Sequence, residues 1–223
     1  MSPGRPDHGD PSSGLPWSPS VFNLRAIGPE PDGATPLDET ELVGLIPGFV
    51  ATRADLNVVE FENIAKAMPW AVDQARRGGP ELVLSYAFVF ALHRRMFQDV
   101  WRWAGTQRRR VTNIGVDPSQ ISMQTKQTID DAVWWHENDM FDVDDRAARI
   151  HWRLVSVHPF PNGNGRCTRL LADLYLLSIG NHAFTWGAGG RLEEAGDERR
   201  RYLDALFAAD NEDYEPLVKF ARS

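Results

Sequence analysis

The sequence predicts an all-α domain of about seven or eight helices with one short β excursion. Apolar residues recur at helical spacing through most of the chain, and residues that start or end helices bracket these stretches. Only residues 108–120 combine β-branched side chains with helix breakers. The chain has 223 residues, 42% of them hydrophobic, which is enough to bury a sizeable core.

Two regions differ in composition. Residues 1–33 contain seven prolines, five glycines and five serines, and they offer few apolar side chains to bury. We expect a disordered or loosely docked tail there, followed by one domain over residues 34–223.

The first three helices are predicted from residues that start or end helices and from apolar spacing. A short helix is predicted within residues 35–48, because Thr-Pro favours a helix start and Pro-Gly ends it. A second helix is expected from residue 54 to residue 76, where Gly-Gly-Pro stops it, with a kink or split at Pro69. Residues 81–98 are apolar almost all round, which predicts a central helix.

The remaining pattern is one extended segment and a further set of helices. Residues 108–120 predict a short hairpin or flap, since valine, threonine and isoleucine alternate with Gly and Asp-Pro. Helical spacing and caps then predict helices over residues 122–139, 143–157, 165–179, 197–209 and 212–222.

Charge and cysteine content limit the function classes. The 31 acidic and 24 basic side chains give a net charge of −7, so no global field draws the protein to nucleic acid or anionic lipid. The arginines at 108–110 are therefore expected to form a solvated edge. One cysteine excludes an intrachain disulfide, and no apolar run is long enough to span a bilayer. We expect a cytoplasmic protein with no membrane or nucleic-acid partner.

Residues 158–169, His-Pro-Phe-Pro-Asn-Gly-Asn-Gly-Arg-Cys-Thr-Arg, carry the strongest chemical signal. Gly-Asn-Gly at a helix start presents backbone N–H groups that have no intrahelical acceptor, and this geometry binds phosphate. Arg166 and Arg169 share one helix face, and His158 has an imidazole suited to proton transfer near neutral pH. The segment predicts phosphoryl or nucleotidyl transfer to a hydroxyl.

The same residues resemble the motif of the Fic family, H-x-F-x-(Asp or Glu)-G-N-G-R-x-x-R, at every specified position but one. Residues 92–109 and the last two predicted helices also resemble Fic proteins, so that the resemblance covers about residues 35–220. The opening GATPLDETELVGLIP and the HPFPNGNGR form resemble the branch called mobile mystery protein B.

This resemblance implies a compact Fic-type helical bundle with a β-hairpin flap that binds ATP and Mg²⁺. It would transfer AMP to a Tyr, Ser or Thr hydroxyl of a target protein. His158 would be the general base, Phe160 the structural anchor of the loop, and the nucleotide would be bound by Gly163, Asn164, Gly165, Arg166 and Arg169. The target segment would dock on the flap residues Val111, Thr112, Asn113, Ile114 and Gly115.

One motif position departs from the family. Asn162 stands where Asp or Glu usually binds Mg²⁺, and a neutral amide oxygen is a weaker ligand than a carboxylate. Three alternatives follow: Mg²⁺ held mainly by the nucleotide phosphates, a different phosphate-containing donor, or a catalytically weak nucleotide-binding module. The last would act in a toxin–antitoxin-like complex with an antitoxin-like protein.

An inhibitory element is also a candidate. Thr35-x-x-x-Glu39 resembles the core of the family's inhibitory motif, in which the glutamate pairs with the second motif arginine, here Arg169. Thr40 replaces the usual Gly or Asn that follows. An ordinary helix N-cap with acidic first-turn residues explains the same residues.

Overall fold

A computed structural model describes residues 39–187, 192 and 196–223, without the side chains of residues 39 and 40. The predicted tail and Thr35 lie outside these residues, and so does the side chain of Glu39. The helices follow in the order α1 (Glu39–Leu42), α2 (Arg53–Val83), α3 (Tyr86–Phe97), the 3₁₀ helix η2 (Pro118–Gln120), α4 (Ile121–Glu137), α5 (Val143–Val157), α6 (Asn164–Ser178), α7 (Asp197–Ala209) and α8 (Glu215–Arg222).

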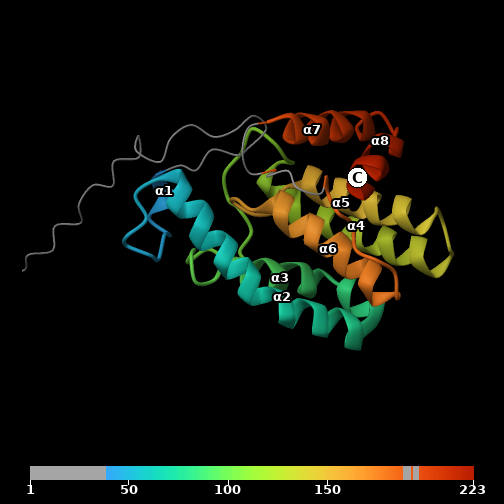
Figure 1. Ribbon diagram of the computed structural model, residues 1–223, viewed down its shortest axis with the longest axis horizontal. Coiled ribbons are helices and arrows are strands. Elements are labelled where there is room, and N and C mark those ends of the chain that lie inside the picture. The colour runs from blue at the N-terminus through green and yellow to red at the C-terminus, as the bar shows by residue number, and fades with distance from the viewer. Residues whose placement is uncertain (1–38, 188–191, 193–195) are drawn as a thin grey trace, which may run out of the picture.

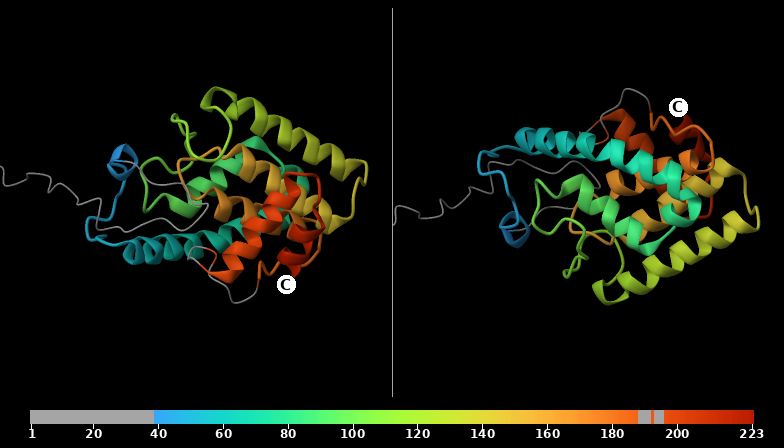
Figure 2. Two further views of the ribbon diagram at one scale, coloured as in Figure 1. Left: turned by 90° about the horizontal axis from the view of Figure 1, so that it is seen from above. Right: turned by 90° about the horizontal axis from the view of Figure 1, so that it is seen from below.

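Helix α6 lies in the middle of the bundle, between α2 and α5 (Figure 1). Helix α3 packs on α2, and α4 packs on α5. Helices α7 and α8 pack on each other, and α8 also contacts α5. Figure 2 shows that the N-terminal half of α2 extends toward α1 beyond the middle of the bundle. The all-α class predicted from the sequence is therefore confirmed.

The apolar residues form two clusters. The larger one joins helices α2 to α6, while the smaller one joins α7 and α8 to α5 around Tyr202, Leu217 and Phe220. The β structure found in the described residues is one isolated bridge between Leu45 and Trp101. Among the same residues, no helix combines the length and the apolar character that a bilayer crossing requires.

Helix boundaries differ from the predicted ones most clearly in α2 and α3. Pro69 lies inside α2 without interrupting it, whereas Gly79 has φ 64° and ψ −172° and breaks the helical geometry near the predicted stop. The predicted helix over 81–98 begins only at Tyr86. Ser85 is its N-cap, with extended backbone and a side chain that accepts a hydrogen bond from Phe88 N at 3.1 Å.

The expected β-hairpin is not seen. Residues 111–117 form a bent loop without a strand. The backbone on either side of this loop bonds to the end of α5 and the residues that follow it, because Arg108 N donates to Pro159 O at 2.9 Å and Val116 N donates to Val157 O at 3.3 Å. These bonds take the place of the pairing across the loop that a hairpin needs.

Small residues set the spacing on the buried face of α2. Ala71 is fully buried, and α2 packs against α3 and α6 there. We expect Ala71→Leu to lower the free energy of unfolding by about 1–3 kcal/mol, because the added carbons have no space in a close-packed interior. Ala65 is exposed on the same helix, so Ala65→Leu is the matched control. Urea unfolding measures both, and equal stabilities for the two variants would contradict the packing.

Candidate functional site

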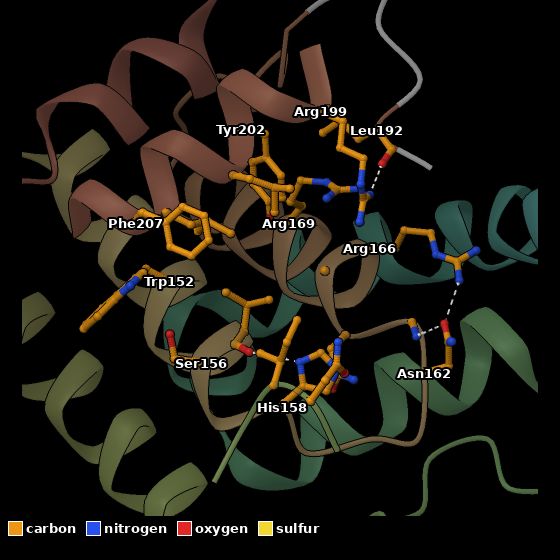
Figure 3. A pocket seen from close by; sticks show the side chains of 18 of the residues that line it. Trp152, Ser156, His158, Asn162, Arg166, Arg169, Leu192, Arg199, Tyr202 and Phe207 are labelled. Carbon is orange, nitrogen blue, oxygen red and sulfur yellow. Dashed lines mark hydrogen bonds between the residues drawn. The ribbon is translucent and has the colours of Figure 1, made fainter. Parts of the chain in front are cut away.

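One cavity of about 430 Å³ brings most of the predicted site together. Its lining includes His158, Arg166, Arg169 and the whole 162–165 turn, together with Asn113 and Ile114 of the flap. Figure 3 shows His158, Asn162 and the two arginines around this cavity. The cavity is also lined by residues that were not predicted from the sequence, from α2, α5, α7 and the C-cap of α7: Arg53, Asn57, Glu60, Trp152, Arg199, Tyr202 and Asp210.

The turn between α5 and α6 is held in an unusual backbone shape. His158 ends α5 in the left-handed region with φ 55°, and Gly163 starts α6 with φ 77°. A Cβ on Gly163 would lie 2.6 Å from the Phe97 ring, so only glycine fits there. The buried Asn164 amide closes the turn, because its Oδ1 accepts from Phe160 N at 2.9 Å and its Nδ2 donates to Phe160 O at 2.8 Å. The amide of Asn164 thus shapes the turn between α5 and α6.

Phe160 and His93 hold this turn in place. Phe160 is fully buried and stacks on the His93 ring, with centroids 3.8 Å apart. His93 Nδ1 accepts from Gly105 N at 2.9 Å, so Nε2 carries the proton and donates to Asn162 O at 3.0 Å. Burial lowers the pKa of His93 to about 3, which keeps this ring neutral.

The geometry of His158 suits a general base. Its Nδ1 lies 3.2 Å from Val155 O, and a carbonyl only accepts, so Nδ1 carries the proton and Nε2 is the nitrogen with a lone pair. Burial, together with the smaller effect of the nearby Arg108 charge, lowers the pKa of His158 to about 4. The imidazole is therefore neutral near pH 7 and able to take a proton.

Arg166 is oriented by a buried acid. Its Nη1 donates to Glu60 Oε2 at 2.7 Å, and the other oxygen of Glu60 accepts from Trp101 Nε1 at 2.7 Å. Glu60 is only 3% exposed. A carboxylate fixed at both oxygens holds the guanidinium in one place and leaves its other edge toward the loop.

Arg169 is oriented by a chain of hydrogen bonds that starts at Tyr202. Tyr202 accepts a hydrogen bond from Arg169, and its ring lies 5.3 Å from the guanidinium carbon. Thr168 Oγ1 donates to Asn164 O at 2.9 Å and so accepts from His151 Nδ1 at 3.0 Å. His151 Nε2 then accepts from the Tyr202 hydroxyl at 2.9 Å. Tyr202, the partner of Arg169, is thus connected by hydrogen bonds to the backbone of Asn164 in the turn.

The side chains at the motif's metal position do not fit a magnesium ion held by the protein. Asn162 Oδ1 accepts from Gly163 N at 2.6 Å and lies 3.4 Å from Arg166 Nη2, so the oxygen is engaged and faces a positive charge. No group of three His, Cys, Asp or Glu side chains that could bind a metal occurs in the described part of the chain. Mg²⁺ prefers carboxylates, which this position lacks.

The flap is built around Arg108, and the prediction of a solvated arginine edge is wrong for this residue. Arg108 is 1% exposed. Its guanidinium donates to four carbonyls, those of His158 at 2.6 Å, Arg110 at 2.8 Å, Val116 at 2.5 Å and Val157 at 3.4 Å. The flap and the turn that follows α5 therefore share one organising side chain.

The other flap residues lie at different depths. Val111 is 71% exposed, and Thr112 Oγ1 donates to Ile114 O at 2.6 Å. Gly115 has φ 104°, and a Cβ there would lie 2.5 Å from His158 Cβ. Arg110 forms a bidentate ion pair with Glu41, at 2.8 and 2.7 Å, so this arginine too is engaged. Of the three arginines at 108–110, only Arg109 is exposed.

Sequence reasoning missed Glu60, Arg53, Tyr202 and Arg199. For Glu60 a signal exists, because this acid falls on the buried stripe of α2 that starts at Leu56. Arg53, Tyr202 and Arg199 reach the cavity only through the packing of α2 and α7 on the central helices, which no local pattern encodes.

Comparisons with known proteins agree with this geometry. Residues 83–176 match the family described as Fic/DOC. Probable protein adenylyltransferase y4lH of Sinorhizobium fredii is 32% identical over 181 residues, covering 77% of this chain and 90% of that protein. Protein adenylyltransferase fic-1 of Caenorhabditis elegans is 32% identical over 107 residues, 47% of this chain but only 19% of that protein. The crystal structure of BepC from Bartonella tribocorum with bound AMPPNP shares the fold, with a TM-score of 0.60 and 16% identity over 83% of this chain and 97% of that chain.

The buried state of His158 makes stability depend on pH. Because the pKa of His158 is about 4 in the folded state and higher when unfolded, the unfolded state binds more protons between these values and stability falls as pH falls. Relative to His158→Asn, which tolerates the left-handed backbone, the parent should lose about 3 kcal/mol between pH 6.5 and pH 4. Urea unfolding of both proteins across this range measures the difference. A constant difference would show that the ring is solvated.

The role of Arg108 is tested by replacing it and comparing the result with the same replacement at the next residue. Arg108→Met should lower the free energy of unfolding by at least about 2 kcal/mol, because carbonyls are left without a donor. Hydrogen exchange of the amides at 110–117 should become faster. Arg109→Met, at an exposed position, is the control. Unchanged exchange in Arg108→Met would show that the flap is held by other contacts.

Proposed function

The chain belongs to the Fic/DOC family, and from this premise we propose that it is a protein adenylyltransferase, which transfers AMP from ATP to a Tyr, Ser or Thr hydroxyl of a target protein. The observation that carries the proposal is the shared cavity. It joins a neutral imidazole, the N-terminus of α6 and two oriented arginines with the flap residues Asn113 and Ile114.

The chemistry assigned to this chain is a single displacement. His158 Nε2 takes the proton of the target hydroxyl, and the hydroxyl oxygen forms a bond to the α-phosphorus of ATP. The bond from that phosphorus to the bridging oxygen of the β-phosphate breaks, and pyrophosphate leaves. Most of the rate then comes from positioning and charge neutralisation.

The phosphates are assigned to the turn and the arginines. Backbone N–H groups at residues 163–165 and the positive end of the α6 dipole attract the triphosphate. Arg166 and Arg169 bind the β- and γ-phosphates, each already oriented by a buried partner, Glu60 or Tyr202. Magnesium, when bound, would add charge neutralisation and would be held mainly by the nucleotide phosphates.

The flap is assigned to the target. A target segment that lies along residues 111–115 in extended form would place its hydroxyl near His158, because Gly115 directly adjoins that histidine. Backbone pairing with the target would then supply the strand partner that the flap lacks in the structure.

The test is label transfer from ATP labelled in the α-phosphate to proteins of a cell lysate. We expect the parent protein to label target bands. His158→Asn should lower the labelling signal by at least about 100-fold, because the general base is removed. The assay is repeated in a Glu39→Gly background, so that inhibition by Glu39, if it operates, does not hide the activity. The control is ATP binding, which His158→Asn should retain.

Two outcomes would contradict the proposal. Labelling that persists in His158→Asn would exclude His158 as the base. ATP binding without any His158-dependent label, in either background, would favour the nucleotide-binding module that acts with an antitoxin-like protein.

A further inference from the structure

We propose that residues 15–27, which precede the described part of the chain, dock in the same molecule on an exposed apolar stripe of α2. The stripe consists of five exposed residues of that helix: Ala54, Val58, Phe61, Ala65 and Met68. The inference does not depend on the proposed function, because none of these five residues lines the cavity.

The stripe follows one face of α2 over about four turns. Its residues are spaced alternately four and three positions apart, the repeat with which a helix presents a continuous apolar edge to a partner. Val58 is 56% exposed, Phe61 is 72% exposed and Met68 is 36% exposed. A continuous apolar edge of this kind on an otherwise packed bundle indicates a surface that receives another segment.

Exposed apolar residues are concentrated near the start of the described chain. Of the eleven large apolar residues that are exposed in the described part, six lie within residues 43–68: Val43, Ile46, Phe49, Val58, Phe61 and Met68. Helix α1, where the described chain begins, lies at the same end of the molecule as the N-terminal half of α2 (Figure 2). The uncovered apolar surface is therefore close to the point at which residues 1–38 join the domain.

Residues 1–38 carry most of their apolar side chains in one group. Apart from Met1 and Leu37, all the large apolar residues of this region fall between positions 15 and 27: Leu15, Trp17, Val21, Phe22, Leu24 and Ile27. Residues 28–38, with three prolines and two glycines, separate this group from α1. The sequence thus joins one apolar segment to the domain through a tether.

The tether is long enough for the segment to reach the whole stripe. Residues 24–38 span up to about 50 Å when extended, whereas Ala54 and Met68 lie about 21 Å apart along the helix. Because the segment and the stripe belong to one chain, the effective concentration of the segment is on the order of millimolar. A separate protein at micromolar concentration would compete only if it bound about a thousandfold more tightly. The length of the chain therefore favours its own segment over an external partner.

Charge also favours this segment over a second copy of α2. The edge of the stripe carries two acids, Asp55 and Glu62, each one position after a stripe residue. Two α2 helices packed antiparallel along their stripes would bring these acids of both copies together, and like charges repel. Residues 11–29 contain no acid, and their one charged side chain is Arg25, directly after Leu24. A cation at this position complements the acidic edge of the stripe.

Trypsin cleavage after Arg25 measures the docking in the full chain. We expect Phe61→Asp to speed this cleavage by about tenfold, because loss of the apolar contact leaves the segment accessible to the protease. Met123→Asp is the matched control, since Met123 is 65% exposed on α4. Circular dichroism and thermal melting verify that both variants are folded.

A reciprocal experiment measures the accessibility of the stripe. Ala65→Cys places a thiol on the stripe, while Cys167, the one native cysteine, is buried. Labelling of the new thiol by a maleimide should become at least about fivefold faster when Leu24→Asp is added, because a charge in the segment opposes its burial. With Met123→Cys in place of Ala65→Cys, Leu24→Asp should leave the labelling rate unchanged.

Three outcomes would overturn the proposal. The first is an equal cleavage rate for Phe61→Asp and Met123→Asp, and the second is an equal labelling rate with and without Leu24→Asp. The third is protection from trypsin that increases with protein concentration, because the docked segment would then come from a second copy. None of these results changes His158-dependent label transfer, so the proposed function is tested separately.

Discussion

The site depends on the backbone reversal between α5 and α6. Two residues with positive φ, His158 and Gly163, turn the chain within a few residues, and the Asn164 amide closes the turn by bonding both backbone groups of Phe160. This places the imidazole at the end of one helix beside the amide groups at the start of the next. An imidazole and a helix N-terminus, which the proposed function assigns as base and phosphate-binding turn, therefore adjoin each other through a single local constraint.

Charge in the cavity is opposite to the charge of the whole chain. The net charge is −7, yet four arginines line the cavity: Arg53, Arg166, Arg169 and Arg199. The protein places these groups on three different helices and orients two of them with buried partners, a carboxylate for Arg166 and a phenol for Arg169. A local concentration of oriented guanidinium groups binds a polyphosphate even when the global field is unfavourable. The net charge of the whole chain therefore does not exclude a local site for an anion.

The sequence was most informative where the structure is local. Helix class and the positions of the motif residues followed from spacing, capping and the resemblance, and the predicted residues of the turn do line one cavity. The absence of the hairpin could not be predicted from local patterns. The conformation of the 111–117 loop depends on Arg108, and the carbonyls that this buried arginine binds are distant in the sequence or lie across the loop. Likewise Glu60 lies more than 100 positions from Arg166, and only the packing of α2 on α6 brings them together.

The flap, the turn and the N-terminal segment form one connected unit. Arg108 bonds the backbone of His158 and of the flap, so neither can move without disturbing the other. Arg110 pairs with Glu41, and Trp103 Nε1 donates to the Glu41 carbonyl at 3.1 Å, which attaches α1 to the flap. A change in the position of α1 would therefore reach the histidine through a part-buried ion pair and hydrogen bonds. This connection gives residues near the start of the described chain a physical route to His158.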